Sequence, residues 1–255
     1  MIIVSAGDAI TAKLIQEAGF DGIWVSGFET SARLGLPDNG SITMTEMLNE
    51  AKKIVNAVDL PVYVDIDTGY GNLTRTVKEF ERIGVTGVCV EDNVFPKTNS
   101  LFGGNLPLED MVLHGDRLAK AREVSNIEII ARTEALIRGY SMREALKRAG
   151  FYRGSGANWT LIHSRDTTGV EALAVADAID GHEIKLVTIP TKFPHITCKE
   201  LYKAGYSMIV WANHTERVKI KAIRKALKKM KTADCPLPVE GTLAVSLEDL
   251  KGLTQ

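Results

Sequence analysis

The sequence has little of several features that mark particular classes of protein. Its three cysteines, Cys89, Cys198 and Cys235, are odd in number and lack CxxC spacing, which argues against a disulfide framework or a zinc site. The formal net charge of −1 gives no reason to expect nucleic acid or a membrane as a partner. No signal peptide and no membrane-length apolar run is present. A soluble, cytoplasmic protein is therefore expected.

Short apolar runs alternate with amphipathic segments along the whole chain. The runs are rich in β-formers and nearly continuous in apolar character, which is typical of strands buried on both faces. The predicted strands are Ile2–Ser5, Gly22–Ser26, Val62–Asp67, Val85–Glu91, Glu128–Arg132, Trp159–His163, Lys185–Ile189 and Met208–Trp211. The helical patterns include Thr11–Ala18, Thr43–Ala57, Arg75–Ile83, Ser141–Tyr152 and Glu216–Met230.

Eight β/α units in 255 residues predict a (β/α)₈ TIM barrel. An open doubly wound sheet is the alternative, and the absence of a GxGxxG motif after the first strand weakens it. No composition shift marks a second domain, so residues 1–255 are expected to form one barrel domain. Residues 232–255 then form a C-terminal extension, with Pro236 and Pro238 in a loop and a short helix around Val245–Leu250.

Polar residues stand where the predicted strands end, which in a barrel is where active sites lie. Asp65 and Asp67 close the third strand, Glu91 the fourth, Arg132 the fifth and His163 the sixth. Crowded carboxylates repel one another unless a cation joins them, and oxygen ligands favour Mg²⁺ or Mn²⁺. The strand ends therefore predict a divalent metal beside a site for an anionic small molecule.

Each of these residues also has a plainer interpretation. An Asp-x-Asp pair is often only a strand end with a turn, a single histidine is more often packed than catalytic, and a single arginine often forms a structural ion pair. Their coincidence at separate strand ends favours a site. The basic stretch Lys219–Lys231 is interpreted as a solvated helix face, and Cys89, inside a strand, as a core residue.

The residues also resemble a known family, the phosphoenolpyruvate mutases of the isocitrate lyase/phosphoenolpyruvate mutase superfamily. The similarity runs over nearly the whole chain. It includes the Asp65–Gly71 turn, Glu91–Ser100, Ala131–Ala135, His163–Ser164, Ile189–Lys192 and Trp211–His214. The resemblance implies Mg²⁺-dependent interconversion of phosphoenolpyruvate and 3-phosphonopyruvate.

The resemblance also implies a role for each matching residue. Asp65 would bind the metal directly, and Asp67, Glu91 and Asp38 would hold its waters. The pyruvyl part of the substrate would be held by the backbone amides of Gly27 and Phe28, with Ser26 and Trp24 nearby. The phosphoryl group would contact Arg132, His163, Asn99 and Ser100, and Lys97 would close over it with the Asn93–Asn105 loop, hinged at Gly103 and Gly104.

The segment Glu91–Ser100 distinguishes members of the superfamily. Its carbon–carbon lyases carry a catalytic cysteine there, and this chain has neither cysteine nor histidine in the segment. Phosphonopyruvate hydrolases resemble the mutases but tend to have threonine at the position of Asn99, so the asparagine favours a mutase. A phosphonopyruvate hydrolase is the alternative, and a non-catalytic, metabolite-binding relative is a third hypothesis.

The chain departs from the family in a few places. Family members commonly have lysine where this chain has Asn93, which removes a positive charge at the root of the loop. Phe28 replaces a usual leucine, and the loop around Asp38 is altered. The family's helix before the first strand is missing, so either the start is truncated or a partner covers this end. The resemblance implies a homotetramer, a dimer of dimers that exchange a C-terminal helix.

Overall fold

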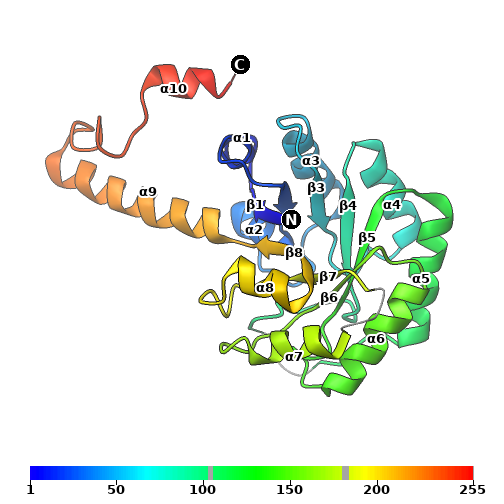
Figure 1. The fold of residues 1–255 in the computed structure, drawn as a ribbon. Helices are drawn as coiled ribbons and strands as arrows, with labels where there is room; N and C mark the ends of the chain where they lie inside the picture. Colours follow the sequence, from blue (N-terminus) through cyan, green and yellow to red (C-terminus); the bar gives the residue numbers. More distant parts are fainter. Residues whose placement is uncertain (103–105, 180–183, 255) are drawn as a thin grey trace.

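The fold is a closed barrel of eight parallel strands that follow one another in chain order (Figure 1). The computed structural model describes residues 1–102, 106–179 and 184–254, so the predicted hinges Gly103 and Gly104 lie outside the described residues. The strands are β1 (Ile2–Ser5), β2 (Gly22–Val25), β3 (Val62–Asp65), β4 (Gly87–Glu91), β5 (Glu128–Thr133), β6 (Trp159–Ile162), β7 (Leu186–Thr188) and β8 (Tyr206–Trp211). The predicted TIM barrel is confirmed.

Four strands, β2, β3, β6 and β7, end earlier than the sequence predicted, and for β2 and β3 the local cause is clear. β3 ends at Asp65 because the chain then turns, with Asp67 in the left-handed region at φ 51°. β2 ends at Val25 because Ser26 is the N-cap of the next helix and accepts a hydrogen bond from the amide of Glu29. Asp65 and Asp67 are therefore not on one side of a continuous strand.

Period-two alternation divides the strand side chains between the barrel interior and the helical layer. One cluster of buried residues takes a member from every strand, including Ile3, Tyr63, Cys89 and Leu161. Two further clusters join the other strand face to the helices. The interior is thus filled by side chains rather than open, as in other small barrels.

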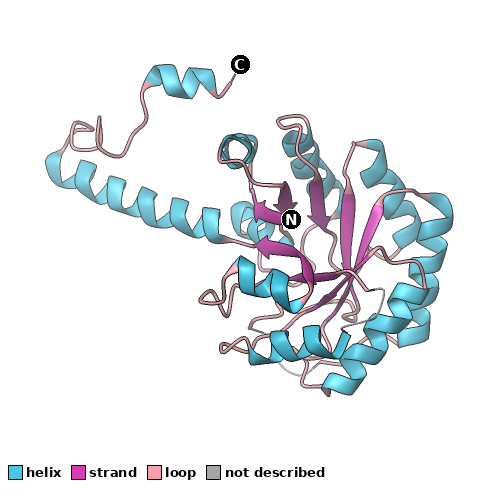
Figure 2. Cartoon of the chain, viewed as in Figure 1, coloured by secondary structure: helices cyan, strands magenta, loops and turns pink. Residues whose placement is uncertain are grey.

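Helices follow the strands along the chain, and those before the last two surround the barrel (Figure 2). They are α1 (Ala9–Glu17), α2 (Gly27–Leu34), α3 (Met44–Val55), α4 (Leu73–Arg82), α5 (Met111–Val124), α6 (Met142–Gly154), α7 (Val170–Ile179), α8 (Cys198–Ala204), α9 (His214–Ala233) and α10 (Leu247–Gly252). Thr43 and Glu46 form a capping box at the start of α3. Since α2 begins directly after Ser26, its N-terminus lies at the end of β2, at the mouth of the barrel.

The C-terminal part of the chain leaves the barrel. α9 projects away from it as a single long helix, and α10 follows after a loop (Figure 1). The chain then returns toward α1, where Lys13 donates a hydrogen bond of 2.6 Å to the carbonyl of Leu253. None of the helices in the described ranges has the length and apolar character needed to cross a membrane.

Candidate active site

The inward-facing positions of four neighbouring strands continue directly into polar residues. Two residues beyond the core side chains Tyr63, Cys89, Ile130 and Leu161 stand Asp65, Glu91, Arg132 and His163. Because alternate residues of a strand share a face, all four polar side chains point to the axis of the barrel. Strand register brings two of them side by side, since Glu91 is paired with Arg132. The fold therefore gathers residues that the sequence only places at separate strand ends.

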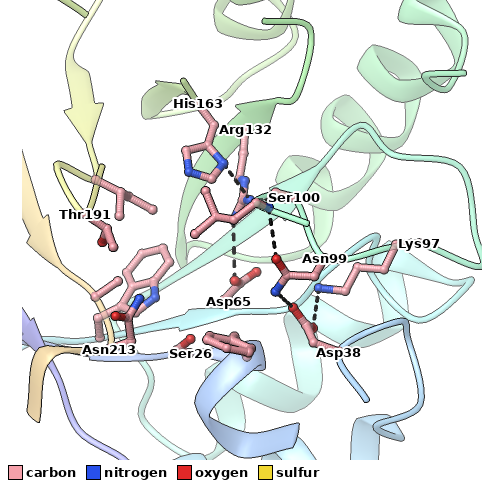
Figure 3. A pocket seen from close by; sticks show the side chains of 15 residues that line it. Ser26, Asp38, Asp65, Lys97, Asn99, Ser100, Arg132, His163, Thr191 and Asn213 are labelled. Atoms are coloured by element: carbon pink, nitrogen blue, oxygen red, sulfur yellow. Dashed lines mark hydrogen bonds and ion pairs between the residues drawn. The ribbon is translucent and has the colours of Figure 1, made fainter. Parts of the chain in front are cut away.

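Three of these residues, Asp65, Arg132 and His163, line a small cavity of about 60 Å³ at the mouth of the barrel (Figure 3). The lining consists of Trp24, Ser26, Phe28, Asp38, Asp65, Lys97, Asn99, Ser100, Leu101, Arg132, His163, Ile189, Thr191, Ala212 and Asn213. Of the predicted site residues, Gly27, Asp67 and Glu91 do not line the cavity but contact or adjoin residues that do. A cavity of this size suits a ligand of few heavy atoms.

Arg132 is the centre of one side of the cavity. Its Nε donates to Glu134 Oε1 at 2.6 Å, and its Nη2 donates to Ser100 Oγ at 2.8 Å. His163 Nδ1 lies 3.0 Å from Arg132 Nη2 and 2.9 Å from Glu134 Oε1. Nearby carboxylates raise the pKa of Arg132 against the opposing effect of burial. The guanidinium is thus a fixed positive charge that faces the cavity.

The charges on this side set the ionisation of its other members. Burial alone would raise the pKa of Glu134, but Arg132 and His163 lower it below its usual range. Burial and the charge of Arg132 lower the pKa of His163. Glu134 is therefore an anion that orients Arg132, and the imidazole of His163 is neutral near pH 7 in the absence of a bound anion.

Lys97 is the centre of the opposite side. Its Nζ lies 2.6 Å from Asp67 Oδ1 and 2.9 Å from Asp38 Oδ1. The side chain is only 5% exposed. Burial lowers the pKa of Lys97, but the surrounding carboxylates, Glu91 and Asp67 first among them, outweigh this effect and raise the pKa above its usual value. The ammonium group thus occupies the position of a cation among the acidic residues.

Two carboxyl groups on this side lack full compensation. Glu91 is completely buried, and its Oε2 accepts no hydrogen bond from the described residues. Burial raises the pKa of Glu91 to about 8, against the opposing charges of Lys97 and Arg132. Burial likewise raises the pKa of Asp67 to about 6, with Lys97 opposing and Asp65 adding to the rise. This part of the site favours a further positive charge.

The N-terminus of α2 forms the floor of the cavity. Ser26, its N-cap, and Phe28 both line the cavity, and Gly27 lies between them. A Cβ at Gly27 would come within 3.0 Å of Asp67 Oδ1, so a larger residue here would require the Asp67 side chain to shift. The first amides of a helix have no intrahelical acceptor and favour anions. Trp24, from β2, lines the same part of the cavity.

Asp38 shares the ammonium group of Lys97 with Asp67 and contacts the loop that follows β4. In addition to its ion pair with Lys97, its Oδ2 accepts a hydrogen bond of 2.5 Å from Asn99 Nδ2 (Figure 3). The Asn99 Oδ1 accepts from the amide of Leu101 at 2.9 Å. Asp38 therefore joins the α2–α3 connection to the loop that covers the cavity, and both Asn99 and Ser100 reach the cavity from that loop.

Sequence reasoning gave no role to three residues that the structure brings to the site. Glu134 orients both Arg132 and His163, as described above. Thr191 and Asn213 follow β7 and β8 and line the cavity, and Thr191 Oγ1 is buried without a hydrogen-bond partner among the described residues. Their positions directly after two predicted strands were the signal that would have identified them. His214, in contrast, begins α9 and does not line the cavity.

The donor set fits a metal that is bound largely through water. Within residues 1–102, 106–179 and 184–254, no three His, Cys, Asp or Glu residues are grouped closely enough to hold a metal ion directly. Asp65 lines the cavity, and the buried oxygen Glu91 Oε2 accepts no hydrogen bond from the described residues, whereas Asp67 Oδ1 is paired with Lys97 Nζ at 2.6 Å. One direct carboxylate with further carboxylates acting through water is a pattern that Mg²⁺ favours, since it retains several waters.

A barrel with this set of charges at the carboxyl ends of its strands is typical of an enzyme that acts on a small anionic molecule. A family model described as phosphoenolpyruvate phosphomutase matches residues 1–231. The chain therefore belongs to the phosphoenolpyruvate phosphomutase family, within the isocitrate lyase/phosphoenolpyruvate mutase superfamily.

Relatives of different activity are similar to the chain to nearly the same degree. A phosphoenolpyruvate phosphomutase of Tetrahymena pyriformis is 31% identical over 95% of this chain and 83% of its own length. A phosphonopyruvate hydrolase of Variovorax sp. is 35% identical over 89% of this chain and 81% of its own. A 2,3-dimethylmalate lyase also matches. Identity alone therefore supports the family and not one reaction.

Solved structures give the same result. The crystal structure of a phosphoenolpyruvate phosphomutase from Streptomyces platensis subsp. rosaceus has a TM-score of 0.96 and 35% identity, and the match covers 100% of this chain and 90% of that one. A phosphonopyruvate hydrolase in complex with oxalate and Mg²⁺ has a TM-score of 0.93 and 30% identity, over 100% and 89% of the two chains.

Proposed function

We propose that this chain is a phosphoenolpyruvate mutase that interconverts phosphoenolpyruvate and 3-phosphonopyruvate. The observation that carries the proposal is the loop after β4. It brings Lys97, Asn99 and Ser100 to the cavity, and Ser100 accepts a hydrogen bond from Arg132. Groups that hold a phosphoryl oxygen thus stand where the lyases of the superfamily carry a catalytic cysteine.

The proposed reaction is an isomerisation in which no proton is gained or lost overall. The P–C bond of phosphonopyruvate breaks, its electron pair remains in the pyruvate enolate, and the enolate oxygen then bonds to phosphorus. A loose phosphoryl transition state requires positioning and positive charge more than acid–base chemistry. Arg132, Asn99 and Ser100 are placed to hold the phosphoryl oxygens, with His163 beside the guanidinium.

The pyruvyl part of the substrate would lie on the floor of the cavity. There the amides of Gly27 and Phe28 at the start of α2 offer hydrogen bonds to a carboxylate or an enolate oxygen. Asp65 would be the direct ligand of Mg²⁺, or of Mn²⁺ as a substitute, and Asp67, Glu91 and Asp38 would hold its waters. When bound, the metal would supply positive charge for the enolate oxygen.

The loop after β4 would also protect the moving phosphoryl group from water. Lys97 and Ser100 on this loop are only 5% and 7% exposed. A closed loop of this kind is what a phosphoryl transfer that avoids hydrolysis requires. The alternative is hydrolysis of phosphonopyruvate to pyruvate and phosphate by the same residues, which the 35% identity to a phosphonopyruvate hydrolase favours.

Incubation of the protein with phosphonopyruvate and Mg²⁺, followed by ³¹P NMR, separates the two reactions. Conversion of the phosphonate resonance into that of phosphoenolpyruvate supports the mutase. Release of inorganic phosphate in its place establishes the hydrolase, and an unchanged spectrum at high enzyme concentration refutes both. A titration with Mg²⁺ in the same buffer tests the third hypothesis, a non-catalytic relative, for which no binding is expected.

Asn99→Ala tests the assignment of the phosphoryl group to the loop. We expect turnover to fall by about a hundredfold, because a hydrogen bond to a charged group in the transition state is lost, while the Mg²⁺ affinity stays within about twofold. Asn49→Ala, at an exposed position on α3, is the matched control. Unchanged turnover in Asn99→Ala refutes the assigned role.

We also propose that the chain forms a homotetramer, a dimer of dimers that exchange α9. The support is the surface of this helix, whose residues are all at least partly exposed in the described chain. Val218, Ile223 and Leu227 are 66%, 56% and 58% exposed, a large apolar surface for a helix in water. Light scattering tests the mass, and Leu227→Glu is expected to yield smaller species.

A further inference from the structure

The root of the loop that covers the cavity is held by Asn93. This residue is 3% exposed, and its backbone pairs with that of Leu108 in an isolated antiparallel bridge. The neighbouring amide of Glu109 also donates to the carbonyl of Asp92 at 2.8 Å. The chain therefore leaves and rejoins the barrel at Asn93 and Leu108, and Lys97, Asn99 and Ser100 all lie between these two points.

The side chain of Asn93 uses both ends of its amide. Its Nδ2 donates to Glu91 Oε1 at 2.7 Å, and its Oδ1 accepts from Arg138 Nε at 2.9 Å. Asn93 thus connects a carboxylate of the acidic cluster to a guanidinium that lies outside the cavity. The lysine common in the family at this position would offer a positive charge but no acceptor.

Arg138 continues the connection into the loop itself. It lies in the turn after β5, is 2% exposed, and donates through its own backbone amide to the carbonyl of Glu134 at 2.9 Å. Its Nη1 donates to Thr98 Oγ1 and its Nη2 to the Thr98 carbonyl, both at 3.1 Å. Thr98 stands between Lys97 and Asn99, so its position fixes the residues on both sides of it.

We propose that Arg138 is a positioning residue that, through Asn93 and Thr98, ties the closed loop to Glu91. In this chain the positive charge at the loop root comes from the turn after β5 and not from the residue after Glu91-Asp92. The inference deepens the proposed function, on which its catalytic consequence rests. This connection from Arg138 through Asn93 and Thr98, called the tie below, is a property of the folded chain and can be measured without turnover.

The geometry explains why an arginine is needed at position 138. A planar guanidinium offers several donors in a fixed arrangement, and here three of its nitrogens serve Asn93 and the two acceptors of Thr98. A lysine ammonium is a single point that cannot span them. Burial also removes competing water, so each lost donor leaves an acceptor unsatisfied.

The first part of the test moves the positive charge from position 138 to position 93 and measures kcat and KM for phosphonopyruvate. We expect Arg138→Ala to lower kcat about tenfold to a hundredfold, with a smaller change in KM. Asn93→Lys alone should also lower kcat, because its ammonium group faces the Arg138 guanidinium. The double variant Asn93→Lys/Arg138→Ala should recover at least about tenfold over either single variant, since it restores one charge at the root.

The second part measures the loop directly, by limited trypsin digestion and mass spectrometry of the Lys97–Thr98 bond. Cleavage should be at least about tenfold faster in Arg138→Ala than in the parent, and Asn93→Ala should behave similarly if Arg138→Ala folds poorly. Arg143→Ala, an exposed arginine on α6, is the matched control and should be cleaved at the parent rate.

The outcomes separate this inference from the proposed function. Parent-like cleavage at Lys97 in folded Arg138→Ala and Asn93→Ala overturns the tie, whatever the reaction. Faster cleavage without recovery of kcat in the double variant overturns the relocation of the charge. If the parent protein does not convert phosphonopyruvate at all, the proposed function fails, while the digestion still decides whether Arg138 holds the loop.

Discussion

Glu134 and Glu91 are two fully buried glutamates beside one arginine, and their pKa values shift in opposite directions. Arg132 Nε lies 2.6 Å from Glu134 Oε1, whereas its Nη2 lies 3.5 Å from Glu91 Oε2. Burial raises the pKa of both, but Arg132 and His163 reverse the effect at Glu134 and hold its pKa below the usual range. At Glu91, Lys97 and Arg132 leave the pKa at about 8.

The difference shows how the two sides of the cavity prepare for different ligands. The side of Glu134 contains its own cation, so it is rigid and already charged for an incoming anion. The side of Glu91 is short of positive charge, which a divalent cation with its waters would supply. The charge of Glu134 is thus balanced by residues of the chain itself, whereas the charge of Glu91 would be balanced by a bound cation.

The largest expected effect comes from Arg132→Met, which removes the charge that both glutamates share. Turnover should fall by at least about a thousandfold, because the phosphoryl group loses its main fixed positive charge. The free energy of unfolding should fall by about 3 to 5 kcal/mol, since Glu134 is left buried and unpaired. Arg75→Met, in an exposed surface pair on α4, is the control and should change stability by less than about 1 kcal/mol.

Arg132→Met is measured by ³¹P NMR turnover and by urea unfolding in the presence of EDTA. A loss of stability no larger than that of Arg75→Met means that Glu134 does not depend on the arginine for its ionisation. The contrast between the two glutamates would then have another cause.

Glu134→Gln tests the side of Glu134 with almost no change in shape. Glutamine keeps an acceptor for Arg132 Nε but loses the charge that holds both the arginine and His163 in place. We expect the free energy of unfolding to fall by about 2 kcal/mol and turnover by about a hundredfold. Chemical denaturation and steady-state kinetics measure the two effects, and an increase in stability would contradict the described ion pair.

Glu91→Gln should have the opposite effect on stability. In EDTA at pH 8 the glutamine avoids a buried, poorly compensated carboxylate, so the free energy of unfolding should rise by about 1 to 2 kcal/mol. Turnover and Mg²⁺ affinity should both fall by at least about tenfold, because a metal-site carboxylate is lost. If the free energy of unfolding rises in Glu91→Gln and falls in Glu134→Gln, the contrast between the two glutamates is confirmed. A change in the same direction in both variants would contradict it.

Stability as a function of pH tests the same contrast in the parent protein, with Glu91→Gln as the reference. The pKa of Glu91 is raised from 4.5 in the unfolded chain to about 8 in the fold. Its contribution is therefore fully present below pH 4.5 and is lost as pH rises through about 8. In EDTA, the parent should lose about 2 to 3 kcal/mol relative to Glu91→Gln between pH 6 and pH 9.

Magnesium should change this pH dependence. Because a bound cation favours the ionised carboxylate, the stabilisation of the parent by 10 mM Mg²⁺, roughly a saturating concentration, should increase from pH 6 to pH 9. Thermal unfolding with and without Mg²⁺ at both pH values measures the effect. Stabilisation that is equal at the two pH values would show that Glu91 does not sense the metal.

The sequence predicted the strands well, since each is an apolar run bounded by turns or helical patterns. It also predicted which residues reach the site from strand ends, because the period of a strand alone turns Asp65, Glu91, Arg132 and His163 inward. The comparison of Glu91 with Glu134 was not predictable, because it depends on a distance difference of less than 1 Å between two ion pairs of one guanidinium.

Contacts between segments far apart in the chain could also not be predicted from the sequence. The link from Arg138 to Thr98 spans 40 residues and arises from how two loops pack, which no local pattern encodes. Asp67 illustrates a smaller limit. It is in place beside Lys97, but it reaches that position through a left-handed turn and not through the predicted continuation of β3.

The smallest effect on turnover and stability is expected from Asp38→Asn. Its size depends on what Asp38 contacts. Asp38 contacts the covering loop through Lys97 at 2.9 Å and Asn99 at 2.5 Å, while Lys97 keeps its closer contact with Asp67 at 2.6 Å. If Asp38 acts only through the loop, the variant should raise KM about two- to fivefold, lower stability by less than about 1 kcal/mol and leave Mg²⁺ affinity unchanged.

The proposed function gives Asp38 a further role, in which it also holds a metal-bound water. That role predicts a drop in Mg²⁺ affinity of at least about tenfold for Asp38→Asn, measured by calorimetric titration against the parent. Asn39→Ala, the exposed neighbour on the same loop, controls for a general disturbance of the segment. A large loss of affinity would place Asp38 with Glu91 on the side that the metal completes. A change confined to KM would make it part of the loop that closes over both sides.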